Sequence, residues 1–152
     1  MSLVLNALVM FLSSAVGTMG FALLLQAPRK AWLPASLIGG AAYALYWLLF
    51  HLGVNEPAAI FTGALLGSLL AQFCARRMRM IATIFITLSI IALVPGLGLY
   101  RCMSLLAQGQ NSAGLQVGIS AMMSFLMIAL GLAVGGYLFR LLVQLLPRKK
   151  AN

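Results

Sequence analysis

The feature of this sequence that most constrains its fold is a series of long apolar runs separated by short clusters of basic residues. A helix needs about 20 apolar residues to cross the hydrocarbon core of a bilayer, and each run approaches or exceeds that length. With 63% hydrophobic and only 7% charged residues, the chain also lacks the polar surface that a soluble domain presents to water. The sequence therefore predicts an all-α integral membrane protein.

The apolar runs predict five transmembrane helices in a single domain, residues 1–152. Short links join the first three helices, and Pro57 suits the first turn of the third. The fourth run is too long for one simple span and is interrupted at Pro95-Gly96, which predicts a broken helix. We expect the spans at about 3–26, 31–53, 57–75, 80–106 (broken) and 115–139, with a basic tail at 140–152.

The basic residues predict how these spans are oriented, because cytoplasmic links are enriched in Lys and Arg. Of the ten Lys and Arg, all except Arg101 fall on one side of the five-span layout. The opposite side holds His51, Glu56 and an uncharged connector at 108–112. We therefore expect the N-terminus outside and the C-terminus in the cytoplasm. The cations expected in the cytoplasm are Arg29, Lys30, Arg76, Arg77, Arg79, Arg140, Arg148, Lys149 and Lys150.

The break in the fourth span is the leading candidate for a functional site. Non-helical backbone within a membrane is tolerated only where protein or a water-filled cavity covers the freed amide groups. We expect the helix to stop near Val94 and to restart near Leu99, since Pro95 lacks an N–H donor and Gly96 and Gly98 relax the backbone. The restarted helix would then direct free N–H groups and its positive dipole end at a ligand.

Arg101 lies in the first turn of the restarted helix, in or near the outer half of the membrane, where a charge is costly. Ser104 and Gln108 share its helix face and form a polar stripe that suits a carboxylate. In the alternative interpretation, the proline only kinks the helix and Arg101 reaches the outer head groups. Both interpretations stay open on the residues alone. The candidate substrate-binding residues are Pro95, Gly96, Gly98, Tyr100, Arg101, Ser104 and Gln108.

Small residues at four-residue spacing predict where the helices pack closely, because helices associate in lipid through close backbone approach. In the last span we expect Gln116, Ser120 and Ser124 to share a face with two glycines and to point at protein. Thr83 and Thr87 lie on one face of the half-helix before the break. They are candidates for ligand binding, but threonine hydroxyls often bond back to carbonyls of their own helix, and this is what we expect here. The glycine pairs are Gly63-Gly67, Gly114-Gly118 and Gly131-Gly135.

Several classes of function receive little support. The sequence has no paired carboxylates, no Ser/His/Asp set, no phosphate loop and no metal-ligand cluster, so we expect no enzyme activity, no cofactor and no metal. Ten basic residues against one acidic residue are compatible with a nucleic-acid binder. They flank apolar runs, however, and do not form a stripe along a helix, so we expect the lipid bilayer as the partner and no nucleic acid.

The segment around the break, Ile90–Arg101, contains Val94-Pro95-Gly96 and Tyr100-Arg101 and is followed by Ala107-Gln108-Gly109. It resembles the Val-Pro-Gly…Tyr-Arg segment of the threonine/serine exporter family, and this is the most specific match. The resemblance covers most of the chain and is to the small membrane subunit, equivalent to the second half of the single-chain exporters. The sequence departs from the commonest pattern at Gln110-Asn111, where an acidic residue often stands. Further matches are Gly20-Phe21-Ala22, Ala27-Pro28-Arg29 and Gly39-Gly40.

This resemblance implies a subunit of a secondary exporter in a bacterial inner membrane, working with a larger membrane subunit of the same family. The substrate would be threonine, serine or a related small carboxylate, and some two-subunit relatives export dicarboxylates. An odd number of spans suits one half of an inverted-repeat transporter. Two other functions stay open: a non-transporting scaffold or assembly subunit, and a small homo-oligomeric channel. A higher oligomer is also open.

Overall fold

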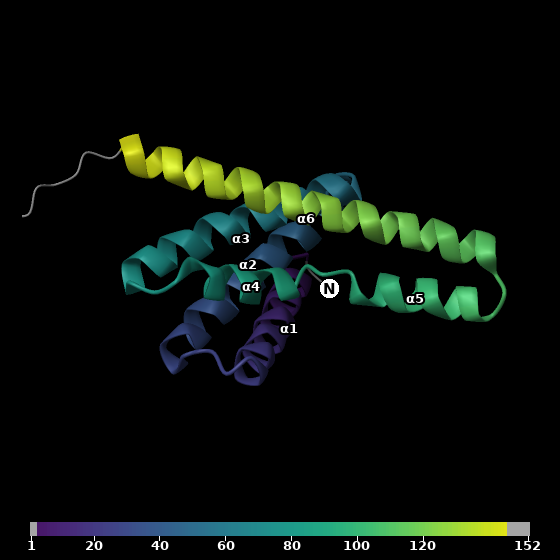
Figure 1. Ribbon diagram of the computed structural model, residues 1–152, viewed down its shortest axis with the longest axis horizontal. Helices are drawn as coiled ribbons and strands as arrows, with labels where there is room; N and C mark the ends of the chain where they lie inside the picture. The colour runs from purple at the N-terminus through teal and green to yellow at the C-terminus, as the bar shows by residue number, and fades with distance from the viewer. Residues whose placement is uncertain (1–2, 146–152) are drawn as a thin grey trace, which may run out of the picture.

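The computed structural model describes residues 3–145, and this part of the chain is helical, with six helices and no strand (Figure 1). Four of the helices are long and apolar enough to cross a membrane, and a fifth crossing results if the bent pair α4 and α5 is one span. The predicted all-α membrane fold with a broken fourth span is confirmed. The helices are α1 (Leu3–Leu24), α2 (Arg29–His51), α3 (Glu56–Met78), α4 (Ala82–Ile91), α5 (Gly96–Ala107) and α6 (Asn111–Leu145).

Helices α1 to α4 form a bundle, and α6 crosses one side of it along α3 (Figure 1). Helix α2 packs against α1, α3 and α4, while α3 packs against α2, α4 and α6. Phe85 and Leu88 of α4 are completely or almost completely buried among small side chains of the neighbouring helices, including Ala35 and Ala71. Alanine at these positions lets the helices approach closely, as expected where lipid provides no hydrophobic drive for association.

Helix α5 and the first part of α6 form a hairpin that projects away from this bundle (Figure 1). Helix α5 packs against α6 and contains no buried residue. Gly109, with φ of +76°, provides the turn between the two helices. The 35 residues of α6 extend about 52 Å, which exceeds the roughly 30 Å hydrocarbon core of a bilayer. The hairpin side chains Leu97 and Tyr100 are 75% and 71% exposed.

The three glycine pairs lie at contacts between helices, as their spacing predicts. A Cβ atom on Gly131 would lie 2.7 Å from the carbonyl oxygen of Phe61, and one on Gly63 would lie 2.9 Å from that of Ala42. The pair Gly114-Gly118 faces Leu106 and Cys102 on α5. These glycines therefore form the α3–α6, α2–α3 and α5–α6 contacts.

The expectation for the polar residues of the last span is only partly correct. Ser124 is buried, whereas Gln116 and Ser120 are exposed. Helix α6 packs against α5 through its first half and against α3 through its second half, in two different directions. No single face of this helix is therefore covered along its whole length.

The break lies slightly earlier than predicted, because α4 ends at Ile91 and α5 begins at Gly96. The residue before a proline is disfavoured in helical conformation, so the helix stops before Val94. Pro95 caps the second helix, and its carbonyl oxygen accepts the N–H of Leu99 at 3.2 Å. Helix α5 therefore begins directly after Pro95.

The helices at both ends of the chain also differ from the predicted spans. Helix α6 begins at Asn111 and continues to Leu145, whereas the sequence predicts a span over 115–139. The left-handed conformation of Gly109 completes the turn before Asn111, so the polar connector is shorter than predicted. Helix α1 ends at Leu24 because Gln26, with φ of +51°, turns the chain toward α2. Arg148, Lys149 and Lys150 of the predicted tail lie outside the described residues.

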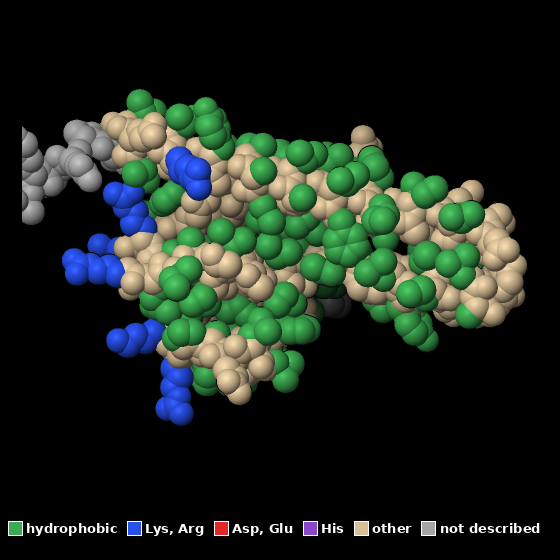
Figure 2. Space-filling view, viewed as in Figure 1, with side chains coloured by type: hydrophobic (Ala, Val, Ile, Leu, Met, Phe, Trp, Pro, Cys, Tyr) green, Lys and Arg blue, Asp and Glu red, His purple; other side chains and the backbone are tan. Residues whose placement is uncertain are grey.

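The described basic residues other than Arg101 lie at helix ends that meet at one end of the molecule. They stand at the start of α2, at the end of α3 and near the end of α6, and Figure 2 shows Lys and Arg side chains gathered at that end. We call this the basic end. The hairpin of α5 and α6 projects from the opposite end (Figure 1). The residues of the basic end are Arg29, Lys30, Arg76, Arg77, Arg79 and Arg140.

The glycine contacts predict a specific loss of stability. Replacing Gly131 with alanine should lower the free energy of unfolding by about 1–3 kcal/mol, because the added Cβ meets backbone atoms of α3 that cannot move aside. Gly20→Ala is the matched control, since a Cβ there meets nothing within 4 Å. Denaturant unfolding of the purified protein in detergent measures both variants. Equal stability of the two would contradict close packing at Gly131.

Candidate functional site

The break between α4 and α5 is a tight turn centred on Pro95. This residue has φ of −76° and ψ of 62°, and the N–H of Gly96 donates to the carbonyl oxygen of Val94 at 2.8 Å. These values define an inverse γ-turn. The N–H groups of Leu93 and Val94 both donate to the carbonyl oxygen of Ile90, so the end of α4 remains hydrogen-bonded. The two helices are bent by 52° relative to each other.

The beginning of α5 leaves backbone donors available. The N–H groups of Leu97 and Gly98 have no acceptor among the described backbone carbonyls, and no side chain caps the helix. A helix start of this kind concentrates positive potential at its first turn. The break can therefore interact with an anionic group.

The predicted site residues are placed along one exposed helix. Arg101 and Tyr100 are exposed, and Gly98 faces Ala121 of α6. The Gln108 side-chain amide donates to the Ser104 hydroxyl at 3.1 Å, so the structure brings these two members of the polar stripe together. Arg101 makes no hydrogen bond to another described side chain, and its guanidinium remains available on the flank of α5.

A small pocket lies on the bundle side of the break, between α1, α2 and the end of α4. Its volume is about 230 Å³, and Ile91, the last residue of α4, lines it on the side of the break. The Ser14 hydroxyl donates to the carbonyl oxygen of Gly39 at 3.4 Å, and the Thr18 hydroxyl to that of Ser14 at 2.9 Å. These hydroxyls were not among the predicted site residues, although they stand out in the apolar first span. The pocket is lined by Ser13, Ser14, Gly17, Thr18, Phe21, Tyr43, Ile91 and Ala92.

A second polar cavity, which we call the α3–α4–α6 groove, lies nearer the basic end. It has a volume of about 480 Å³. The sequence offered one signal for it, a serine and a glutamine four residues apart in the mostly apolar third span. Its polar lining residues are Ser68, Gln72, Tyr137 and Arg140, and its other lining residues are Ala82, Ile86, Leu132, Ala133 and Gly136.

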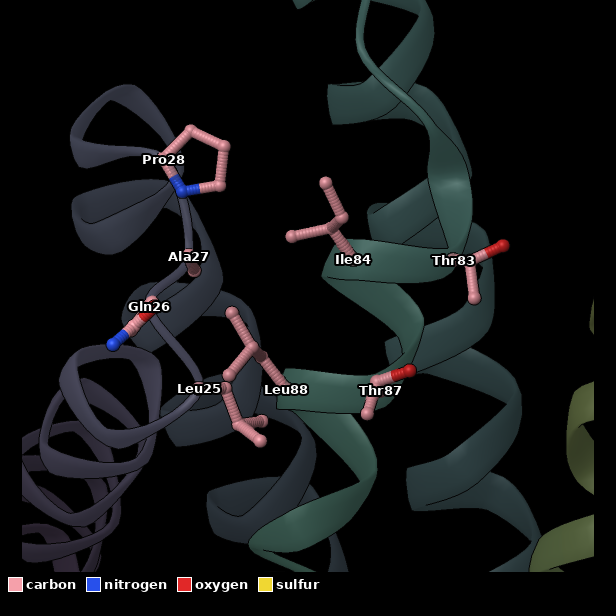
Figure 3. Close-up of a pocket in the computed structure, with 8 residues that line it drawn as sticks. All are labelled: Leu25, Gln26, Ala27, Pro28, Thr83, Ile84, Thr87 and Leu88. Atoms are coloured by element: carbon pink, nitrogen blue, oxygen red, sulfur yellow. The ribbon is translucent and has the colours of Figure 1, made fainter.

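A third cavity, of about 330 Å³, lies between the turn after α1 and helix α4 (Figure 3). Leu25 and Leu88 face each other across it, while the hydroxyls of Thr83 and Thr87 point away from the α1–α2 turn (Figure 3). Neither threonine hydroxyl makes a hydrogen bond to a described residue, so the expected bonds back to their own helix are absent in this part of the chain. Both threonines are exposed on the outer face of α4.

Comparison with known protein families identifies the family of this chain. The family model described as "Threonine/Serine exporter, ThrE" matches residues 10–137. The chain belongs to the threonine/serine exporter family. The match includes the break, Arg101 and all but the last part of α6. No solved structure matches this chain.

Membership of this exporter family gives the helical bundle a transporter-type role in a membrane. The four spanning helices and the bent pair agree with a multi-pass membrane protein. Among the described residues, no group of three His, Cys, Asp or Glu side chains is placed to hold a metal ion. The polar chemistry at the break consists instead of backbone donors, hydroxyls and one guanidinium.

Proposed function

We propose that this chain is a subunit of a secondary exporter of threonine, serine or related small carboxylates. In this proposal the Pro95 break and Arg101 contribute to binding the substrate carboxylate, and a larger subunit of the same family completes the pathway. The observation that carries the proposal is the restart of α5 with free backbone donors, one turn before the guanidinium of Arg101. Family membership supports export as the transport process.

The chemistry of α5 suits a carboxylate. Arg101 follows Leu97 and Gly98 by four and three residues, so these residues share one side of α5. Helical side chains lean toward the N-terminus, so the guanidinium of Arg101 can lie near the free N–H groups at the start of the helix. Backbone N–H groups at a helix start and a guanidinium both donate to carboxylate oxygens, and such charge-assisted bonds are stronger than neutral ones. The hydroxyl-lined pocket on the other side of the break would offer partners to a hydroxyl-bearing substrate.

The hairpin supports the need for a partner subunit. Between α5 and α6 runs an apolar groove of about 410 Å³, on a hairpin whose α5 contacts only α6 extensively. A partner helix in this groove would cover the open side of the break and shield Arg101 from lipid. An amino-acid substrate also carries an ammonium group, and the one acidic side chain of this sequence, Glu56, starts α3. The partner would supply the missing acceptor.

The basic end suggests the orientation in the cell. Lys and Arg are enriched on the cytoplasmic side of membrane proteins. We place the basic end in the cytoplasm of a bacterial cell, which leaves the N-terminal end of α1 and the hairpin turn toward the outside.

Replacing Arg101 with Gln should abolish export while the complex still assembles, because the neutral amide keeps much of the size but loses the charge that binds the carboxylate. The measurement is efflux of labelled threonine and of labelled succinate from cells that express this chain together with its larger subunit. Arg77→Gln, an exposed position at the basic end, is the control and should leave efflux unchanged. Normal efflux of both compounds by the Arg101 variant would rule out the proposed role.

The partner should contact the hairpin and not the outer side of α2. A photo-crosslinking amino acid at Met103 should form an adduct with the larger subunit, whereas the same group at Leu33 should not, although the two side chains are 71% and 69% exposed. Mass spectrometry of the adducts identifies the crosslinked chain. Adducts only between copies of this chain would contradict the proposal and favour a homo-oligomeric channel.

The orientation predicts which positions an impermeant maleimide labels in intact cells. In a variant whose Cys74 and Cys102 are replaced by alanine, a cysteine at Gln110 should react from outside. A cysteine at Lys30 should react only after permeabilisation. The reverse pattern would place the basic end outside.

A further inference from the structure

The α3–α4–α6 groove has the geometry of a ligand site because of how three helices meet. Helices α4 and α6 each pack on α3, and the space between them has α3 as its floor. Ala82 and Ile86 of α4 form an apolar wall, while α6 forms the opposite wall. The result is an open cleft of about 480 Å³ with an apolar α4 wall, a polar floor at Ser68 and Gln72, and a mixed α6 wall that ends in Tyr137 and Arg140.

The floor of the groove carries an amide that is only partly satisfied. The Ser68 hydroxyl donates to the carbonyl oxygen of Leu132 at 3.3 Å, and the Gln72 amide donates to the Ser68 hydroxyl at 3.4 Å. A Cβ on Gly136 would lie 3.5 Å from Gln72 Nε2, so the amide lies over this glycine. Among described residues, Gln72 makes no other side-chain hydrogen bond. Its carbonyl and a second N–H therefore remain for a ligand.

Among the described residues, the cation of the groove has no acidic partner. Arg140 lies one turn after Gly136 on α6. The single acidic side chain, Glu56, begins α3 sixteen residues before Gln72, which corresponds to about 24 Å along the helix. The guanidinium and the neighbouring Tyr137 hydroxyl are thus positioned for an anion that comes from outside the chain.

We propose that the α3–α4–α6 groove is a binding site for a small aliphatic carboxylate at the basic end, separate from the break at Pro95. Arg140 binds the carboxylate, Gln72 orients it, and Ala82 and Ile86 cover the aliphatic part of the ligand. The class of ligand rests on the proposed export function. The site lies where a substrate from the cytoplasm would first meet the protein.

The test measures binding to the full chain purified without its partner, so its result does not depend on export. Calorimetric titration with succinate and with L-threonine should show saturable binding of at least one probe. Arg140→Gln should weaken it about tenfold or more, since a hydrogen bond to a charged group contributes about 1.5–3 kcal/mol. Arg140→Lys should recover part of the loss, and Gln72→Leu should weaken binding less. Arg29→Gln, at the same end on α2, is the matched control and should bind like the wild type.

Other outcomes overturn the proposal. These are the absence of saturable binding of both probes in the millimolar range, or equal binding by the Arg140→Gln variant with an unchanged unfolding midpoint. A third is that phosphatidylglycerol in nanodiscs binds the protein in an Arg140-dependent manner while neither carboxylate binds. That result would make the groove a lipid head-group site. If cells show no export but the purified chain still shows Arg140-dependent binding, the proposed function is refuted and the binding site in the groove is supported.

Discussion

The close approach of α6 to α3 at Gly131 and Gly135 is the contact on which the rest of the structure depends. In lipid, two helices gain little from hiding apolar side chains, so their contact relies on packing of atoms at short range. The absence of a side chain at these glycines lets α6 lie directly against the backbone of α3. The same contact forms one side of the α3–α4–α6 groove and holds the base of the projecting hairpin.

Much of this architecture could be predicted because it follows from properties of single segments. Hydropathy and charge are enough to predict the all-helical membrane fold and the basic end, and Pro95 is enough to predict the break. The helix ends were less predictable, since polar residues such as Asn111 can begin a helix as easily as they end a loop.

The groove could not be predicted from the sequence because its residues come from three helices. The sequence shows only the spacing of Ser68 and Gln72, and the register of α6 on α3 is what brings Tyr137 and Arg140 beside them. The exposure of Gln116 and Ser120 has a related cause. Helical spacing assigns residues to a face, but the neighbour that covers this face changes where α6 leaves α5 and meets α3.

The distribution of charge connects the two candidate sites. With one acidic side chain against ten basic ones, the sequence cannot neutralise its guanidinium groups internally. Two of these groups lie at the candidate sites, Arg101 on α5 after the break and Arg140 in the groove. Helix α4 lies between these sites, because its residues Ala82 and Ile86 line the groove and its last residue, Ile91, lies at the break. Its exposed threonines, Thr83 and Thr87, carry hydroxyls that make no hydrogen bond within the described part of the chain. Arg101 and Arg140 are both exposed, so under the proposed function a second protein surface would have to face α4 and α5 to enclose the two sites.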